Sequence, residues 1–139
     1  MIVLDTNVVL ETKRERMSDR VLSWLDRQED HDLWLTAITA AELQAGVEKY
    51  PDGDDRTRRQ TEVSAILQED FPGRILPFDL PAALAYARIA GPLIRSERAV
   101  RRMDLQIAAI AKANGASLAT RNIRDFGGFG VDLIDPWTA

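Results

Sequence analysis

The chain has 139 residues, of which 45% are hydrophobic and 29% are charged, a composition typical of a globular protein rather than a disordered one. It contains no cysteine and only one histidine, which excludes disulfides, thiol nucleophiles and metal sites built from Cys or His ligands. Its net charge of −4 excludes a uniformly basic nucleic-acid-binding surface but not a local basic patch. A metal ion would need oxygen ligands, which favours Mg²⁺ or Mn²⁺.

The first residues show no sign of export or of membrane insertion. The chain starts MIVLDTNVVLE, with no basic segment before its apolar residues and with an acidic residue at position 5, unlike a signal peptide. Its longest apolar runs fall far short of the roughly 20 residues that cross a bilayer. We therefore expect a cytoplasmic protein that makes no membrane contact.

Short apolar runs alternate with segments of helical periodicity from the start of the chain. The pattern predicts a strand at residues 2–4 and then a helix capped by Ser18. A second strand is predicted at residues 33–35. Thr39 is expected to open the next helix, and a further helix is predicted over residues 56–69.

The middle of the chain predicts one more strand and a long helix. The strand is expected at residues 75–78, and Pro81 suits the first turn of a helix that runs to about residue 94. Gly91 and Pro92 lie inside this helix and should kink it or end it early.

The last third predicts a helix at residues 105–112, a strand at residues 117–119 and a weaker strand at residues 133–134. Strands that alternate with helices in this way predict an α/β fold with a parallel sheet. The chain has no internal repeat, and its polar turn at residues 51–55 is too short for a domain linker. We therefore expect residues 1–139 to form one domain.

Several polar side chains are expected at the carboxyl ends of the predicted strands, where open parallel sheets bind their ligands. They are Asp5, Glu42, Asp104, Asn122 and Asp125. Asp5 directly follows three buried residues, and an unpaired carboxylate at the edge of a core is costly. Gathered carboxylates also repel one another unless a divalent cation neutralises them. Such a site suits phosphodiester hydrolysis by one or two metal ions.

Most of these residues also have a purely structural explanation. Thr39 and Glu42 have the spacing of a helix capping box. Asp104 fits a first-turn acid that faces the positive end of a helix dipole. Asn122 and Asp125 are ordinary turn residues. The sequence leaves both explanations open for Glu42, Asp104, Asn122 and Asp125.

Four segments along the chain match, in order, the motifs of one protein family. They are IVLDTN at residues 2–7, TAITAAELQAG at 36–46, DLQIAAIA at 104–111, and ATRNIRDF at 119–126 followed by DPW at 135–137. Together they resemble the PIN-domain ribonucleases, particularly the VapC/FitB-like toxins of type II toxin–antitoxin pairs. The resemblance covers the whole chain.

This resemblance implies a PIN-like three-layer α/β/α sandwich with a mainly parallel central sheet of four to five strands. It also implies an Mg²⁺- or Mn²⁺-dependent endoribonuclease with four catalytic residues, Asp5, Glu42, Asp104 and Asn122. Asp5 and Asp104 would bind the metal directly, while Glu42 and Asp125 would contribute through water.

Thr6 and Thr120 would support the site by orienting carboxylates or phosphate with their hydroxyl groups. Many PIN domains have Asp where this chain has Asn122, although Asn is common in this toxin subgroup. Because Asn carries no charge, a second metal ion should bind more weakly unless Asp125 contributes.

The resemblance further implies a homodimer and a small co-encoded antitoxin that inserts an Arg near the acidic site, as well as an RNA substrate. A guanidinium pairs with carboxylates bidentately and keeps its charge when buried, so it can take the place of the metal. The antitoxin would also cover apolar surface beside the helices around Trp24 or Val47.

Positive charge gathers in the second half of the chain. Residues 88–124 hold eight basic and two acidic residues, a net charge of +6. A phosphate backbone that approaches an acidic site needs flanking cations. The candidate RNA-binding residues are Arg98, Arg101, Arg102, Arg121 and Arg124. The alternative is a solvated helix face whose arginines pair with acids elsewhere.

Two other functional classes are compatible with an Asp at a strand end. Aspartyl-phosphate phosphatases expect a second Asp two residues later, where this chain has Asn7, and receiver domains place paired acids after the first strand. Neither pattern fits. A catalytically weak PIN-fold module that binds RNA or protein is the remaining alternative; the retained acids argue against it, and a metal titration would discriminate.

Overall fold

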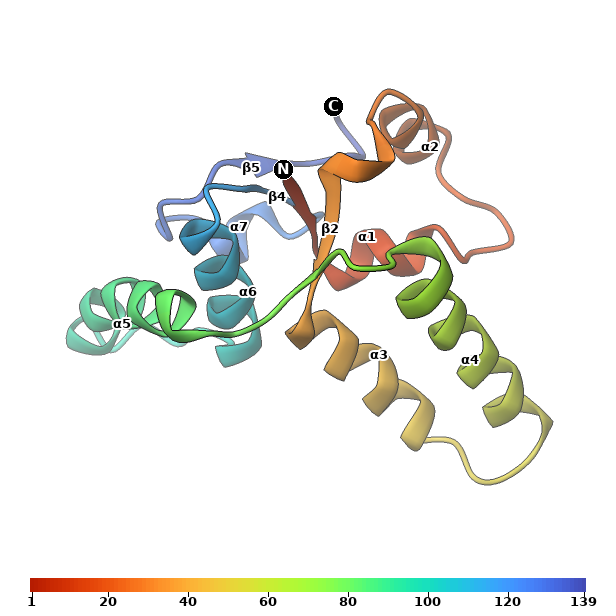
Figure 1. Cartoon of the computed structure of the whole chain (residues 1–139). Coiled ribbons are helices and arrows are strands. Elements are labelled where there is room, and N and C mark those ends of the chain that lie inside the picture. The colour runs from red at the N-terminus through yellow and green to blue at the C-terminus, as the bar shows by residue number, and fades with distance from the viewer.

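Five short strands form one parallel sheet at the centre of the computed structural model, which describes residues 1–139 (Figure 1). The strand order is β3-β2-β1-β4-β5, and every neighbouring pair is parallel. The strands are β1 (Ile2–Leu4), β2 (Leu33–Thr36), β3 (Ile75–Leu76), β4 (Ser117–Ala119) and β5 (Leu133–Ile134). All five predicted strands are present. The third is shorter than predicted because Pro77, which has no N–H, cannot continue the ladder.

Seven α-helices surround the sheet. They are α1 (Thr6–Glu11), α2 (Asp19–Asp26), α3 (Ala37–Glu48), α4 (Asp54–Ala65), α5 (Leu80–Arg95), α6 (Arg102–Ala113) and α7 (Ile123–Phe126). A 3-10 turn at Asp30–Asp32 precedes β2, and a π turn at Ile66–Asp70 follows α4. No helix is both long and apolar enough to span a membrane.

Two hydrophobic clusters fill the two faces of the sheet, which gives the expected α/β/α sandwich. Successive strand residues point to opposite faces, so Val3 and Leu118 join the cluster beneath α5 and α6. Leu4 and Ala119 join the cluster beneath α1 to α4. Figure 1 shows α5 and α6 on one side of the sheet and α3 and α4 on the other.

Helix α6 is the most deeply buried helix. Residues 107–111 on it are completely inaccessible, because it lies between α5 and the sheet. Its alanines, at positions 108, 109 and 111, let both neighbours approach closely. This packing fixes the first turn of α6, which carries Asp104, against the sheet.

Helix α5 runs through Gly91 and Pro92 to Arg95, so the expectation that these two residues end it early is wrong. Pro92 lies in the last turn, where its missing N–H removes only one intrahelical hydrogen bond. Its carbonyl still accepts the backbone N–H of Ser96 at 3.0 Å. The packing of α5 against α6 is sufficient to retain the turn.

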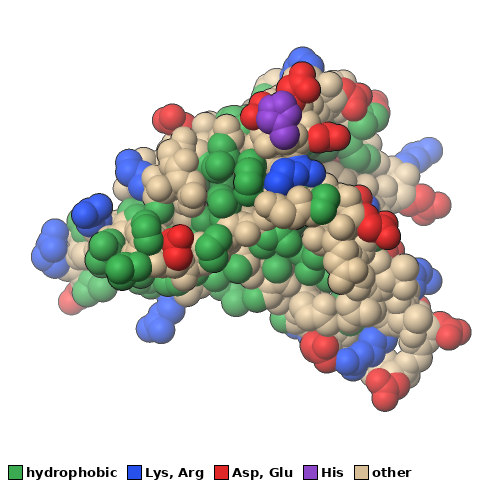
Figure 2. Space-filling model, in the orientation of Figure 1, with side chains coloured by type: hydrophobic (Ala, Val, Ile, Leu, Met, Phe, Trp, Pro, Cys, Tyr) green, Lys and Arg blue, Asp and Glu red, His purple; other side chains and the backbone are tan.

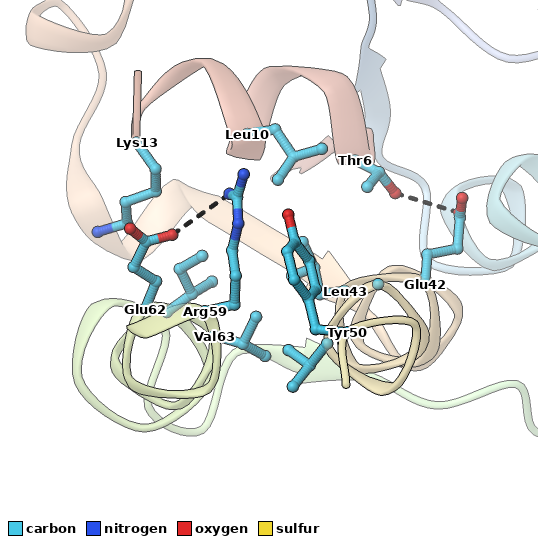
Figure 3. Close-up of a pocket in the computed structure, with 12 residues that line it drawn as sticks. Thr6, Leu10, Lys13, Glu42, Leu43, Tyr50, Arg59, Glu62 and Val63 are labelled. Carbon is cyan, nitrogen blue, oxygen red and sulfur yellow. Dashed lines mark hydrogen bonds and ion pairs between the residues drawn. The ribbon is translucent and has the colours of Figure 1, made fainter. Parts of the chain in front are cut away.

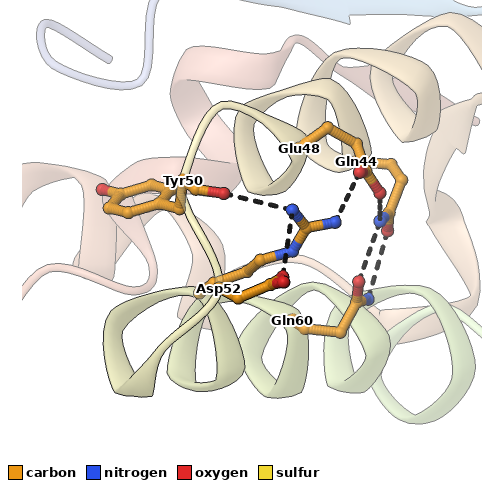
Figure 4. Close-up of polar contacts among 6 residues, drawn as sticks. Gln44, Glu48, Tyr50, Asp52 and Gln60 are labelled. Atoms are coloured by element: carbon orange, nitrogen blue, oxygen red, sulfur yellow. Dashed lines mark hydrogen bonds and ion pairs between the residues drawn. The ribbon is translucent and has the colours of Figure 1, made fainter.

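Helices α3 and α4 form a hairpin that a polar cluster holds at its tip (Figure 4). The Arg56 guanidinium donates to the Tyr50 carbonyl at 3.1 Å and to a Glu48 carboxylate oxygen at 2.6 Å. The amides of Gln44 and Gln60 exchange two hydrogen bonds of 2.8 and 3.1 Å. The hairpin places α3, with Glu42, beside the end of β1.

The beginning of α3 differs from the prediction. Thr36, the last residue of β2, caps the helix, because its side-chain oxygen accepts the backbone N–H of Thr39 at 3.1 Å. The helix therefore begins at Ala37, directly after the strand. Thr39 lies inside it, so the Thr39–Glu42 capping box is wrong and Glu42 is free for other contacts.

Candidate active site

The carboxyl end of β1 places Asp5 at the centre of the candidate site. Its backbone N–H donates to the Ala119 carbonyl at 2.9 Å, which continues the β1–β4 pairing and brings it beside Thr120. Both side chains are buried, with 5% of Asp5 and none of Thr120 exposed. Asp5 is also the N-cap of α1, a six-residue helix that the sequence did not predict.

Three donors orient the Asp5 carboxylate. One oxygen accepts the Thr6 backbone N–H at 2.8 Å. The other accepts the Thr120 hydroxyl at 2.7 Å and the Asn7 amide at 3.3 Å. Burial raises the pKa of Asp5 in spite of these hydrogen bonds, so its negative charge is not fully compensated by the protein.

Glu42 reaches the same region from α3. Its carboxylate accepts the Thr6 hydroxyl at 3.1 Å, and the Thr6 oxygen lies 3.2 Å from the Thr39 hydroxyl. Burial, with a contribution from the charge of Asp5, raises the pKa of Glu42. Thr6 thus links α1 to α3 and holds one of the two Glu42 oxygens.

Asp104 enters from the first turn of α6, which agrees with its predicted position. It is 5% exposed, and no hydrogen bond from the protein reaches its carboxylate. Burial raises its pKa to about 6, opposed by the charge of Arg101 and reinforced by Asp5, Asp125 and Glu42. Asp104 is thus a first-turn acid, as the structural explanation expects, and it also shares the electrostatic field of the other acids.

Asn122 lies in the loop after β4, as the sequence predicts, whereas Asp125 lies in a short helix. Asn122 directly precedes α7 and donates its backbone N–H to the Thr120 hydroxyl at 3.0 Å. Asp125 lies in α7, and its charge raises the pKa of Asp5 and Asp104. Together with Asp104, it lines a cavity of about 130 Å³.

The acidic side chains therefore influence one another's pKa, but they do not form a preassembled metal-binding group. No three acidic or histidine side chains lie close enough together to hold one metal ion. Asp5 and Asp104 nonetheless fit a hard cation in their chemistry, since both are buried carboxylates with raised pKa and no cationic partner within ion-pair distance.

The five candidate RNA-binding arginines differ in their surroundings. Arg98 donates to the Gly127 carbonyl at 3.2 Å, and Arg121 lies over the Trp137 ring at 4.9 Å from its centroid. Arg101 is the only one of the five whose charge lowers the pKa of Asp5, Glu42 and Asp104. None of the five forms an ion pair with an acid, which contradicts the alternative of a charge-paired helix face.

A family model described as the PIN domain matches residues 2–127. The chain belongs to the PIN domain family. It is 40% identical to the VapC ribonuclease Y4jK of Sinorhizobium fredii, over 99% of this chain and 98% of that protein. It is 37% identical to the toxin FitB of Neisseria gonorrhoeae, over 99% of both chains.

Solved structures agree with this assignment. The chain superposes on FitAcB from Neisseria gonorrhoeae with a TM-score of 0.86 and 37% identity, over 100% of both chains. It superposes on FitAB bound to an IR36 DNA fragment with a TM-score of 0.88 and 36% identity, over 99% of this chain and 96% of that one. These likenesses establish the PIN fold that the sequence motifs predict.

The PIN domain also carries a groove between α1, α3 and α4 that begins at the acidic site (Figure 3). Its volume is about 220 Å³, and half of its twelve lining residues are hydrophobic. Thr6 and Glu42 lie at one end, and Figure 3 shows Tyr50 beside Arg59 further along. Val47 is among the lining residues, but its side chain is only 1% exposed, and both Val47 and Trp24, at 5%, belong to the core.

The structure brings into the site two residues that the sequence did not place there. Asn7 donates to Asp5 and accepts the backbone N–H of Arg121 at 3.3 Å, so it joins α1 to the segment after β4. Thr39 contacts the Thr6 hydroxyl instead of capping a helix. For Asn7, its place in the DTN motif was the only sequence signal of a role in the site. For Thr39, no local feature of the sequence indicates its contact with Thr6.

Proposed function

We propose that this PIN domain is an Mg²⁺- or Mn²⁺-dependent endoribonuclease that acts in the cytoplasm as the toxin of a type II toxin–antitoxin pair. The observation that carries the proposal is the placement of Asp5, Glu42 and Asp104, with raised pKa, at one edge of a PIN fold. Full-length similarity to proteins named VapC ribonuclease and toxin FitB supports it.

Asp5 and Asp104 would hold the metal directly, with Glu42, Asp125 and Asn122 completing the set. A bound divalent ion would polarise the scissile phosphate and make a water molecule more acidic. Thr120 and Asn7 keep the Asp5 carboxylate in a fixed orientation.

Glu42 is suited to accept a proton from the attacking water. Thr6 occupies one of its carboxylate oxygens, and the second oxygen has no hydrogen-bond partner in the protein. The raised pKa of Glu42 makes it a better base than an exposed glutamate at neutral pH. Thr6 would therefore set the direction in which Glu42 receives the proton.

Cleavage of a labelled RNA by the purified chain, with Mg²⁺, with Mn²⁺ and with chelator, tests the function. We expect metal-dependent cleavage that Asp5→Asn or Asp104→Asn abolishes and that Glu42→Gln strongly reduces. Asp19→Asn is the matched control, since Asp19 is also a first-turn acid but lies on α2, away from the site. Wild-type rates in the Asp5 or Asp104 variant would contradict the proposed site.

A catalytically weak PIN-fold module that binds RNA or protein is the second candidate. The absence of a preassembled group of three acids favours it. Calorimetric titration with Mn²⁺ separates the two functions, because the proposed nuclease must bind at least one ion per chain.

We also propose a small co-encoded antitoxin as partner, because the solved relatives include FitAB and VapBC toxin–antitoxin complexes. An Arg of the antitoxin would pair with Asp5, Glu42 and Asp104, and an apolar segment would occupy the groove beside Val47. Titration of the purified complex with Mn²⁺ should release the chain. Inhibition that survives replacement of every arginine in the partner would contradict the pairing.

Expression of the chain without a partner should arrest bacterial growth, and expression of the Asp5→Asn variant should not. Arrest by both would show that toxicity does not come from the metal site.

The homodimer is proposed to form through α5. Leu80, Leu84 and Ile94 on this helix are 70%, 51% and 75% exposed, which is unusual for three large apolar side chains on one helix. Figure 2 shows hydrophobic side chains gathered over α5 and across the middle of the same face. A second copy of the chain would bury them.

A further inference from the structure

The loop between α5 and α6 holds an arginine that lies next to the acidic residues but does not pair with them. The charge of Arg101 lowers the pKa of all three acids of the proposed site. No carboxylate lies within ion-pair distance of its guanidinium, and the side chain is exposed. Its hydrogen-bond donors therefore remain available to a ligand.

The backbone around Arg101 is fixed although its side chain is free. Arg98, three residues earlier, donates to the Gly127 carbonyl at 3.2 Å and lies over the Phe129 ring. Val100 packs against the hydrophobic core, and α6 begins directly after Arg101. Because the backbone of Arg101 is held in place, its guanidinium stays close to Asp104.

Positive and negative side chains line one cavity beside the proposed site. Arg98 and Arg101 line it together with Asp104 and Asp125, and its volume is about 130 Å³. This is well above the roughly 10–15 Å³ that one water molecule requires. A phosphate oxygen can therefore enter between Arg101 and Asp104.

We propose that Arg101 binds a non-bridging phosphate oxygen of the RNA and, before RNA arrives, lowers the affinity of Asp5 and Asp104 for a divalent cation. The proposal rests on the proposed nuclease function. An RNA phosphate that approaches three carboxylates is repelled, and a guanidinium at the entrance offsets this repulsion and holds the oxyanion by charge-assisted hydrogen bonds. The same fixed charge repels Mg²⁺ or Mn²⁺ at the neighbouring acids.

The two effects couple substrate binding to metal binding. A phosphate on Arg101 neutralises the charge that opposes the cation, and a bound cation neutralises the acids that oppose the phosphate. By linkage, each ligand raises the affinity of the other by the same factor. The site would therefore take up its metal most strongly when RNA is present.

Replacement of Arg101 by glutamine gives changes in opposite directions, which a merely structural role would not produce. We expect Arg101→Gln to bind Mn²⁺ about twofold to fivefold more tightly in calorimetry, the range for one exposed charge interaction. We expect kcat/KM for an RNA oligonucleotide to fall about 10- to 100-fold, as for the loss of a charge-assisted hydrogen bond. Arg101→Lys keeps the charge and should restore the wild-type Mn²⁺ affinity, with partial recovery of kcat/KM.

Two further arginines serve as controls. Arg102→Gln removes the same charge from the next residue, whose side chain lines a separate cavity against α5, and should leave the Mn²⁺ affinity unchanged. Arg95→Gln removes a charge from the last turn of α5 and should leave both quantities unchanged.

Weaker Mn²⁺ binding by Arg101→Gln, or an unchanged kcat/KM, would overturn the proposal about Arg101. The nuclease function would still stand if the wild-type chain cleaves RNA. If the wild-type chain binds Mn²⁺ but cleaves no RNA, the nuclease function fails. The contact between Arg101 and phosphate is then tested by RNA binding alone. The inactive Asp104→Asn variant should bind RNA more tightly than the Asp104→Asn, Arg101→Gln double variant, and equal affinities would contradict the contact.

Discussion

At the scale of single residues, the pKa of Asp104 is set by burial of its carboxylate without a hydrogen-bond or ion-pair partner. Its pKa is about 6, against 3.8 for an ordinary Asp, so the folded chain holds this proton more tightly than the unfolded chain. The protonated form therefore contributes stability that is fully present below pH 3.8 and is lost as the pH rises through about 6. Asp5 and Glu42 shift in the same direction.

The first prediction follows from this linkage. In chelator, Asp104→Asn should melt at a higher temperature than wild type at pH 7.5, at roughly 4 °C per kcal/mol of relieved charge burial. The difference should shrink towards pH 4.5, where the wild-type carboxyl is protonated. Thermal melts across this range provide the measurement, with Asp19→Asn as the exposed control. A variant that is less stable than wild type at pH 7.5 would contradict the explanation.

The second prediction concerns the two polar residues of the α7 region. Asp125 adds negative charge to the field at Asp5 and Asp104, whereas Asn122 adds none. Asp125→Ala should raise the Mn²⁺ concentration needed for half-maximal cleavage, and Asn122→Asp should lower it, because a hard cation binds more tightly to more carboxylates. Unchanged metal dependence in both variants would place this region outside the metal site.

At the scale of secondary-structure elements, the step from β2 into α3 depends on one buried hydroxyl. We predict that Thr36→Val destabilises the chain by about 1 kcal/mol, since valine has the same shape but cannot cap the helix. Urea unfolding measures the effect. Thr61→Val on the exposed side of α4 should change stability by less than about 0.5 kcal/mol.

Glu42→Gln should leave stability almost unchanged in the same experiment, because the glutamine carbonyl can still accept the Thr6 hydroxyl. A loss of activity with unchanged unfolding would separate the chemical role of Glu42 from any role in helix formation. Destabilisation by Glu42→Gln as large as that by Thr36→Val would instead show that the fold depends on the negative charge of Glu42.

At the scale of the whole molecule, the exposed apolar face of α5 predicts an assembly. Leu84→Glu should convert the proposed dimer to a monomer in light scattering coupled to size-exclusion chromatography, because a carboxylate cannot be buried there without a partner. Leu22→Glu on α2 is the matched control, since Leu22 is 46% exposed on another surface. A dimer that persists in Leu84→Glu would place the interface elsewhere.

The fold class could be read from the sequence alone, and the sequence also proposed the main residues of the site. Short apolar runs located all five strands, because strands buried on both faces consist mainly of apolar residues. The rule that ligands bind at the carboxyl ends of parallel strands then proposed four of the 22 acidic residues as site candidates, namely Asp5, Glu42, Asp104 and Asp125. These properties depend on local composition and on chain order, both of which are visible without coordinates.

Which side chains come into contact could not be read from the sequence and depends on how the elements pack. Helices α1 and α7, with six and four residues, are too short to show a helical period, and contacts at the strand ends create them. Thr36 caps α3 because β2 runs directly into the helix. Arg101 was indistinguishable in sequence from its four neighbours in the basic segment. The contact between Asp5 and Thr120, which are more than one hundred positions apart, comes from the pairing of β1 with β4. The packing of α6 against α5 and the sheet places Asp104 at the same edge, and with it the charge of Arg101 just before the helix.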